Sequence, residues 1–216
     1  MHFTSEKEFF KVAQENRKYM SKTERQKYAI RMYSKDLDES ARMDARNKII
    51  GSYLWDIKFE INEISKKVYS QINKLELINR CVQTIETEIA NYDFFAAKDD
   101  LSYRISSRLR VIIVGYLFES LDDPSMDVSQ VFFLLDGGGI TLGKLYELAK
   151  MTQEMLDRGV DVSMDLNGVI YYNWDTSFYY EGPLKKETRI HYRLVNRFFG
   201  LQRYEKTKIT LWYYDI

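Results

Sequence analysis

The stretch LELINRCVQTIETEIANYD, residues 75–93, most limits what this chain can fold into. Its apolar residues recur at steps of three and four, which places them on one stripe of a helix. This stripe consists of Leu77, Ile78, Cys81, Val82, Ile85 and Ile89. The other face is polar almost throughout. The pattern therefore predicts a helix that packs one side on a core and leaves the other side for solvent or a docking partner.

The composition supplies enough apolar residues for such a core. Of the 216 residues, 45% are hydrophobic and 15% are aromatic, which suffices for one large domain or two small ones. The 32 basic and 32 acidic residues cancel. The net charge therefore indicates neither nucleic acid nor an anionic membrane as a partner.

A single cysteine, Cys81, is accompanied by only two histidines, His2 and His191. This set is too small for a His/Cys zinc site, so we expect no metal and no cofactor. Enzymes can work with carboxylates alone, but we expect no enzymatic activity here. No apolar run approaches the roughly 18 residues of a membrane-spanning helix, and the first residues lack the pattern of a secretory signal. We therefore expect a cytoplasmic protein without a membrane partner.

Helical patterns fill the sequence before LDDPSMD, residues 121–127, and extended patterns become frequent after it. Two Ser-x-x-Glu capping boxes, SEKE and SKTE, predict helices from about Glu6 and about Lys22. A longer helix is expected from about Asp38, because apolar residues recur at helical spacing as far as Val68. A last helix contains RVIIVGYLF, which is apolar on nearly every side and is therefore expected at the centre of the core.

After this boundary, the strand pattern QVFFLL precedes a Gly turn, a helix over residues 141–159 and a second strand pattern, VDVSMDL. This order predicts a βαβ unit with parallel strands. Asn167-Gly168 suits a type I′ turn into VIYYNW, and SFYYE, RIHYRLV and KITLWYY are expected to complete a mixed sheet. The predicted fold class is α+β, with a helical domain over residues 1–122 and an α/β domain over residues 127–216.

The Gly turn raises an enzymatic alternative. Gly138, Gly143 and Lys144 have the Gly-x4-Gly-Lys spacing of a phosphate-binding loop, but Leu145 stands where that motif requires Ser or Thr for magnesium. The stretch is also similar to the Gly-Gly turn of Clp proteases and, in its order of strand, turn and helix, to STAS domains. These two similarities concern the order of elements and predict no activity. We interpret the glycines as a tight turn, with a phosphate- or nucleotide-binding enzyme as the third hypothesis.

A basic stretch runs from Leu184 to Lys208, with eight basic and two acidic residues and a net charge of +6. In a strand, Arg189, His191 and Arg193 alternate onto one face. A basic face of this kind suits phosphates, although it can equally be a solvated face paired with acidic residues elsewhere. Arg189, Arg193 and Arg197 are therefore candidate nucleic-acid contacts.

Three helical stretches carry a family resemblance when they are taken together. DARNKIIGSYLWDI, ELINRCVQTIETEIANYD and LSYRISSRLRVIIVGYL resemble, in this order, the core-binding and promoter-melting module of bacterial RNA polymerase sigma factors over about residues 38–118. In that family an Ala-Arg-Asn-Lys-Leu-Ile-like run precedes a helix that begins Asp-Leu-Ile and closes on Phe-Asp. The chain departs from the family at Cys81 and Thr84, where the family has glycines, and near Ser106 and Ser107, where it has an aromatic pair.

The resemblance implies that the polar face of the 75–93 helix docks on a coiled coil of the largest polymerase subunit. The implied polymerase contacts are Glu76, Asn79, Arg80, Gln83 and Glu86. On the following helix the implied contacts to DNA phosphates are Arg104, Arg108 and Arg110. The leading hypothesis is a divergent sigma-like transcription factor that binds RNA polymerase and modulates transcription initiation. The alternative is a non-enzymatic protein-interaction module, an inhibitor or adaptor such as a mobile element encodes.

Overall fold

The computed structural model describes residues 1–16, 20–95, 101–132, 139–160, 162–166, 168–172, 184–196 and 202–214. For 171–172, 184–196 and 202–214 it describes the backbone alone. The chain divides into two compact units, residues 1–173 and 174–216, and each is considered by itself.

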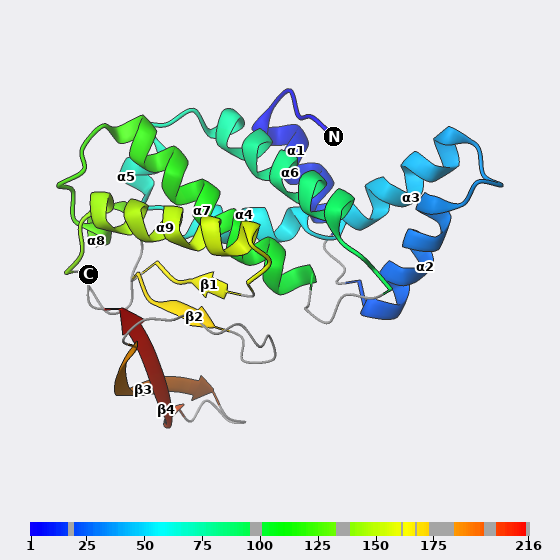
Figure 1. Ribbon diagram of the computed structural model, residues 1–216. Coiled ribbons are helices and arrows are strands. Elements are labelled where there is room, and N and C mark those ends of the chain that lie inside the picture. Colours follow the sequence, from blue (N-terminus) through cyan, green and yellow to red (C-terminus); the bar gives the residue numbers. More distant parts are fainter. Residues whose placement is uncertain are drawn as a thin grey trace. The chain divides into compact units, whose positions relative to one another are not determined.

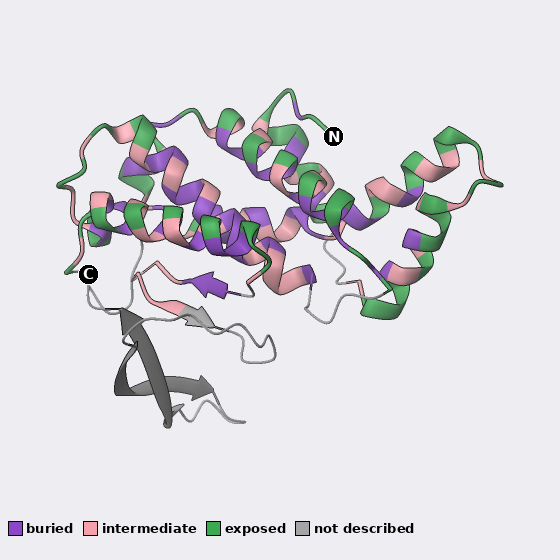
Figure 2. Ribbon diagram, viewed as in Figure 1, coloured by how far each residue is buried: buried purple, intermediate pink, exposed green. Residues whose placement is uncertain are grey.

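The first unit is mostly helical (Figure 1). Its helices are α1 (Glu6–Glu15), α2 (Lys22–Tyr33), α3 (Glu39–Gly51), α4 (Leu54–Asn62), α5 (Lys66–Tyr69), α6 (Lys74–Asn91), α7 (Leu101–Leu121), α8 (Val128–Val131) and α9 (Leu142–Asp157). Its strands are β1 (Val162–Met164) and β2 (Ile170–Tyr172). Buried residues concentrate on α6, α7 and the helices that contact them (Figure 2).

Serine caps begin the first two helices where the sequence predicts them. Ser5 precedes α1, and its side chain accepts a hydrogen bond from the backbone N–H of Glu8. At α2 the capping box is complete, because Ser21 Oγ accepts from Glu24 N and the Glu24 carboxylate accepts from Ser21 N at 2.9 Å. Both predicted helix starts are confirmed.

The long helix expected from about Asp38 to Val68 is instead three helices, α3, α4 and α5. The last break lies at Ser65, whose side chain accepts from the N–H of Val68 and so caps α5. The backbone N–H of Ser65 donates to the carbonyl of Val131, 2.8 Å away. Local capping and a distant backbone partner therefore interrupt an apolar spacing that looks continuous in sequence.

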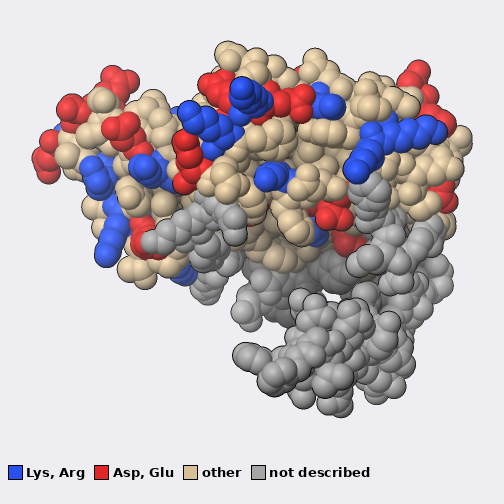
Figure 3. Space-filling view, turned by 180° about the vertical axis from the view of Figure 1, so that it is seen from behind, with Lys and Arg blue, Asp and Glu red and all other residues tan. Residues whose placement is uncertain are grey.

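Helices α2 and α3 pack on each other as a hairpin that projects from the other helices of the first unit (Figure 1). Acidic side chains gather at the outer end of this hairpin, and basic ones are interspersed with acidic ones over the described part of the same face (Figure 3). The described part of the face in Figure 3 thus shows no continuous basic surface. Apart from these charges, the apolar side chains of Ile30 and Tyr33 on α2 are more than half exposed.

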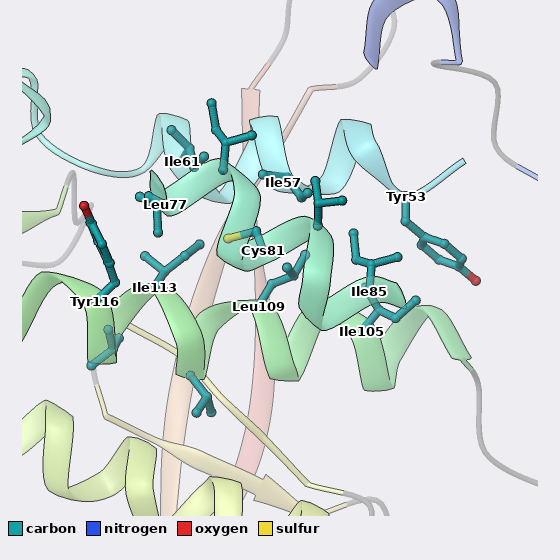
Figure 4. Packing of buried hydrophobic residues seen from close by; sticks show 14 of the residues in the cluster. Tyr53, Ile57, Ile61, Leu77, Cys81, Ile85, Ile105, Leu109, Ile113 and Tyr116 are labelled. Carbon is teal, nitrogen blue, oxygen red and sulfur yellow. The ribbon is translucent and has the colours of Figure 1, made fainter. Parts of the chain in front are cut away.

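Helix α7 is the centre of the core, as its apolar sequence predicts. It contacts α4, α6, α9 and β1, and its buried side chains point in several directions from its axis. Figure 4 shows Ile105, Leu109 and Ile113 of α7 packed against α6, with Cys81 of α6 among them. All six residues of the predicted apolar stripe on α6 are fully buried, so that prediction is confirmed as well.

The predicted α+β fold with a mixed sheet is wrong. The described strands form two separate antiparallel pairs, β1 with β2 and, in the second unit, β3 with β4. The stretch QVFFLL begins in α8, which Asp127 caps through the N–H of Ser129, and Phe132 then forms an isolated antiparallel bridge with Ile64. Its apolar side chains Val131 and Phe132 are buried in the core cluster that the helices dominate, so no parallel βαβ unit exists among the described residues.

The β1–β2 hairpin is where the sequence places it, with Met164 paired to Ile170. Gly168 has a φ of +77°, and a Cβ there would approach side-chain atoms of Ile140 and Leu148 to 2.8 Å, so the turn requires glycine. Asn167 lies outside the described residues. The residues of β1 are buried and pack on α7 and α9.

The described elements of the second unit are β3 (Leu184–Asn196) and β4 (Gln202–Tyr214), paired from Leu184 opposite Tyr214 to Asn196 opposite Gln202. The expected boundary near residues 121–127 lies inside the first unit, where α7 packs on α9. The expected domains, residues 1–122 and 127–216, therefore differ from these two units. The stretch SFYYE lies outside the described residues.

Candidate functional site

A groove lies between α6, α7 and α9. Helix α7 contacts both of the others, and one face of α7 forms the floor of a cavity of about 700 Å³ between them. The floor consists of Arg104, Arg108, Val111, Ile112, Gly115, Tyr116 and Glu119. The α6 wall consists of Arg80, Gln83, Thr84, Thr87, Glu88 and Asn91. The α9 wall consists of Tyr146, Ala149, Lys150, Gln153, Leu156 and Asp157.

An exposed ion cluster around Arg80 lies at one end of the groove. Its guanidinium lies 2.9 Å from both the Glu76 and the Glu119 carboxylates and 4.9 Å from the centre of the Tyr116 ring. The hydrogen bond from Arg80 to Glu119 is the main reason that the pKa of Arg80 is raised. The charge of this arginine is thus balanced within the protein, although its side chain remains 44% exposed.

The other end of the groove contains a buried glutamate, Glu88, which is 5% exposed. Arg104 hydrogen-bonds to one of its oxygens, and Arg108 Nε lies 2.9 Å from the other in an ion pair without hydrogen-bond geometry. Arg108 also reaches Asp157 on α9 at 2.7 Å. Burial opposes ionisation of Asp157, but hydrogen bonds from Gln153 and Arg108 outweigh it and lower its pKa. The network links all three helices.

The middle of the groove is more apolar. Val111 and Ile112 contribute to its floor, and Tyr146 stacks on Phe118 with ring centres 4.1 Å apart. Lys150 Nζ lies 5.1 Å from the centre of the Tyr146 ring. An apolar centre between polar ends is the usual composition of a protein-binding surface.

The five predicted polymerase contacts divide into two sets. Arg80 and Gln83 line the groove, and Glu76 pairs with Arg80 at its end. Asn79 and Glu86 instead hold the start of the chain: the Asn79 amide bonds both the N–H and the carbonyl of Phe3, at 2.9 and 3.0 Å. Glu86 forms an ion pair with the Met1 amino group.

The predicted nucleic-acid contacts of α7 are likewise divided. Arg104 and Arg108 belong to the groove, where both are paired with Glu88. Arg110 lies elsewhere on α7 and donates to both oxygens of Glu60, at 3.1 and 3.0 Å. Their role toward DNA stays a prediction.

The nucleic-acid contacts predicted for the second unit also stay untested. Arg189 and Arg193 lie on β3, where only the backbone is described, and Arg197 lies outside the described residues. The pairing places Glu205 directly opposite Arg193. Residues directly opposite share a face of the pair, so an acidic residue shares the face of the predicted basic contacts.

The turn before α9 has the spacing of a phosphate-binding loop, but the backbone N–H groups at the start of α9 already donate hydrogen bonds within the protein. The N–H groups of Leu142 and Gly143 donate to the carbonyls of Met126 and Pro124, and that of Lys144 to the hydroxyl of Thr141. These are the groups that would bind an anion at the start of a helix. Gly138 lies outside the described residues.

Sequence patterns gave no sign of two neighbouring carboxylates on α4, Asp56 and Glu60. Glu60 is buried and bonded to Arg110 and Ser106. Burial, and then the charge of Glu60, raise the pKa of Asp56 to about 6. Burial likewise raises the pKa of the fully buried Cys81 thiol. Within the part of the chain that the structure describes, no group of three or more His, Cys, Asp or Glu side chains is arranged to hold a metal ion.

Comparisons with known proteins add no family. No protein-family model, no curated protein and no solved structure matches the chain. Among the described helices, none is both long enough and apolar enough to cross a membrane.

The α9 wall of the groove went unrecognised in the sequence, although a helix is predicted there. The sequence pattern places this helix in a βαβ unit, in which it would cover a sheet. The polar residues of this wall, Lys150, Gln153 and Asp157, recur at three and four steps along α9. That spacing marks a common face, but sequence alone does not show that α7 lies beside it.

Proposed function

We propose that the protein is a non-enzymatic interaction module that binds another protein in the groove between α6, α7 and α9. Core RNA polymerase in the cytoplasm is the partner that the resemblance to sigma factors implies, and modulated transcription initiation is the consequence. The proposal is supported by one observation above all: a whole face of the central helix, from Arg104 to Glu119, lines an open groove.

The dimensions of the groove favour a macromolecular partner. The floor from Arg104 to Glu119 is about 22 Å long at 1.5 Å per helical residue, which exceeds the length of most small metabolites. Its arginines already have carboxylate partners, so no concentrated charge remains for a small anion. A long surface with an apolar centre and polar ends is typical of protein recognition.

A binding assay with purified core polymerase tests the proposal. The wild-type chain should bind, and the double variant Glu76→Lys with Arg80→Glu should bind at least about tenfold more weakly, since charge at an interface controls both encounter and retention. Both side chains are exposed and the swapped charges can pair with each other, so the fold should remain. Loss of the exposed pair with Glu119 should cost about 1 kcal/mol or less.

The matched control exchanges an ion pair outside the groove. Lys144 and Glu147 on α9 are 3.2 Å apart and exposed, and Lys144→Glu with Glu147→Lys should leave polymerase binding unchanged. Polymerase that fails to bind the wild-type chain, or that binds the Glu76 and Arg80 double variant equally well, would refute polymerase as the partner.

A further inference from the structure

Gly115 occupies a helical position on the floor of the groove where the described protein does not require glycine. A Cβ added there would meet its nearest neighbour, Tyr146 Cε2, at 3.8 Å, an ordinary van der Waals distance. By contrast, a Cβ at Gly51 or Gly143 would come within 3.0 Å of Asn16 or of the Pro124 carbonyl. Glycine is less favourable than alanine inside a helix, so α7 retains at Gly115 an unfavourable residue without an internal packing reason.

Glycine on a helix surface allows another backbone to approach closely. From this position we infer that the groove receives a single α-helix of the partner, which crosses α7 at Gly115 with its backbone near the floor. The inference rests on the proposed function, because it takes the groove as the binding site.

The shape and lining of the groove define that helix further. The floor of about 22 Å corresponds to about four helical turns, or about 15 residues. Its centre offers Val111 and Ile112, and the walls supply threonine, glutamine and tyrosine side chains. The incoming helix is therefore amphipathic, with an apolar stripe toward α7 and a small residue where it meets Gly115.

Charge adds a second feature of the partner. Arg80, Arg104 and Arg108 all have carboxylate partners in the groove, whereas Lys150 has none among the described residues and rests on the Tyr146 ring. A basic group at an interface favours an opposite charge across it. The helix thus places an Asp or Glu opposite Lys150, close to the crossing point.

A peptide library tests this inference independently of polymerase. Phage-displayed peptides of about 16 residues, which span the floor at 1.5 Å per residue, would be selected on the immobilised full chain. The selected peptides should share an amphipathic helical pattern with a small central residue and an acidic one. Circular dichroism should show that they become helical on binding.

Variants at the floor locate the binding site. Gly115→Ala should raise Tm by about 2 °C, as expected for alanine in a helix, yet weaken the best peptide about tenfold, as the loss of a close contact at an interface centre does. Gly115→Leu fills the groove and should abolish binding. Lys150→Glu should weaken acidic peptides. Glu154→Leu, on α9 outside the groove lining, is the control and should change nothing.

Other outcomes overturn the inference. It fails if the library yields no binder, if the binders stay non-helical, or if Gly115→Leu binds them as well as wild type. Loss of peptide binding to Gly115→Leu with retained polymerase binding would show that polymerase uses another surface. If polymerase binds but no helical peptide is found, the proposed function stands and the inference of a partner helix fails. If helical peptides bind but polymerase does not, polymerase is refuted as the partner and the helix-binding groove stands.

Discussion

Two buried glutamates on different sides of α7 differ in how their charge is balanced. Glu88 of α6 lies between Arg104 and Arg108. Glu60 of α4 has Arg110 as its one arginine among the described contacts, and Asp56 lies one helical turn away. With the glutamates included, the first cluster has two arginines for two carboxylates, Glu88 and Asp157, whereas the second has one arginine for two carboxylates, Glu60 and Asp56.

The cluster around Glu88 stabilises the contacts between helices, whereas the one around Glu60 contains a carboxylate whose charge destabilises the folded protein. A buried charge is tolerated when its partners compensate the lost hydration, and the arginines around Glu88 achieve this while joining α6 to α7 and α9. Near Glu60, the carboxylate of Asp56 has no arginine or lysine partner among the described residues. Its raised pKa shows that burial and the charge of Glu60 disfavour its ionised form. Removing the charge of Glu88 should therefore destabilise the protein, whereas removing the charge of Asp56 should stabilise it.

Glu88→Gln is expected to have the largest effect. It leaves Arg108, whose side chain is 6% exposed, without its buried counter-charge, and breaking a buried ion pair costs about 3 to 5 kcal/mol. Urea unfolding at neutral pH measures this loss. The matched variant Glu60→Gln should cost less, because Arg110 is 29% exposed and Asp56 lies nearby. Equal losses for the two variants would contradict the comparison.

Asp56→Asn should stabilise the protein at neutral pH. Folding raises the pKa of Asp56 from 3.8 to about 6, so the folded state binds this proton more tightly than the unfolded state. Stability therefore falls as pH rises from 3.8 through about 6, and asparagine removes that loss. We expect a gain of about 1 to 2 kcal/mol at pH 7.5 and none below the lower pKa. Denaturant unfolding at both pH values checks this, and a gain at low pH would contradict it.

The smallest effect is expected from Asp157→Asn, at the exposed edge of the Glu88 network. Asp157 is 59% exposed, so its pair with Arg108 contributes about 0.5 kcal/mol. Because the pKa of Asp157 is lowered by folding, this contribution is present at neutral pH and is lost in acid. Unfolding at low and high salt should show that salt reduces the difference between variant and wild type. A salt-independent loss of several kcal/mol would instead place Asp157 in the core.

Local patterns predicted the parts of the fold that depend on neighbouring residues. The α6 stripe and the serine caps at Ser5 and Ser21 are set by spacing and by backbone donors within one turn, and these predictions are correct. QVFFLL was misread because a short apolar run is compatible with a buried strand or a buried helix. The segment it occupies takes its partners from distant residues, Ile64 and Ile140 among them.

The candidate site shows the same limit. Arg80 and Gln83 were predicted on the docking face of α6, and the groove contains both. Glu88, which lies outside the predicted apolar stripe of α6, is buried beside arginines 16 and 20 residues further along the chain. The role proposed for Gly115 depends on α9, a later part of the chain, whose Tyr146 lies 3.8 Å from a Cβ built at this position. Residue spacing predicts which side chains share a face of one helix, but it does not show which helices pack together to form the groove.

The hydrogen bonds between Asn79 and the Phe3 backbone affect when residues near Phe3 can fold during synthesis. The two residues are 76 positions apart, and the Phe3 ring is 2% exposed in the finished structure. During synthesis Phe3 emerges before α6, so it can contact Phe9 early, but its backbone cannot bond Asn79 until residue 79 has left the ribosome. Contacts of such long sequence separation form late, and an exposed aromatic ring on a nascent chain is a site for chaperones or for misassembly. The residues around Phe3 thus reach their final place only after α6 has been made.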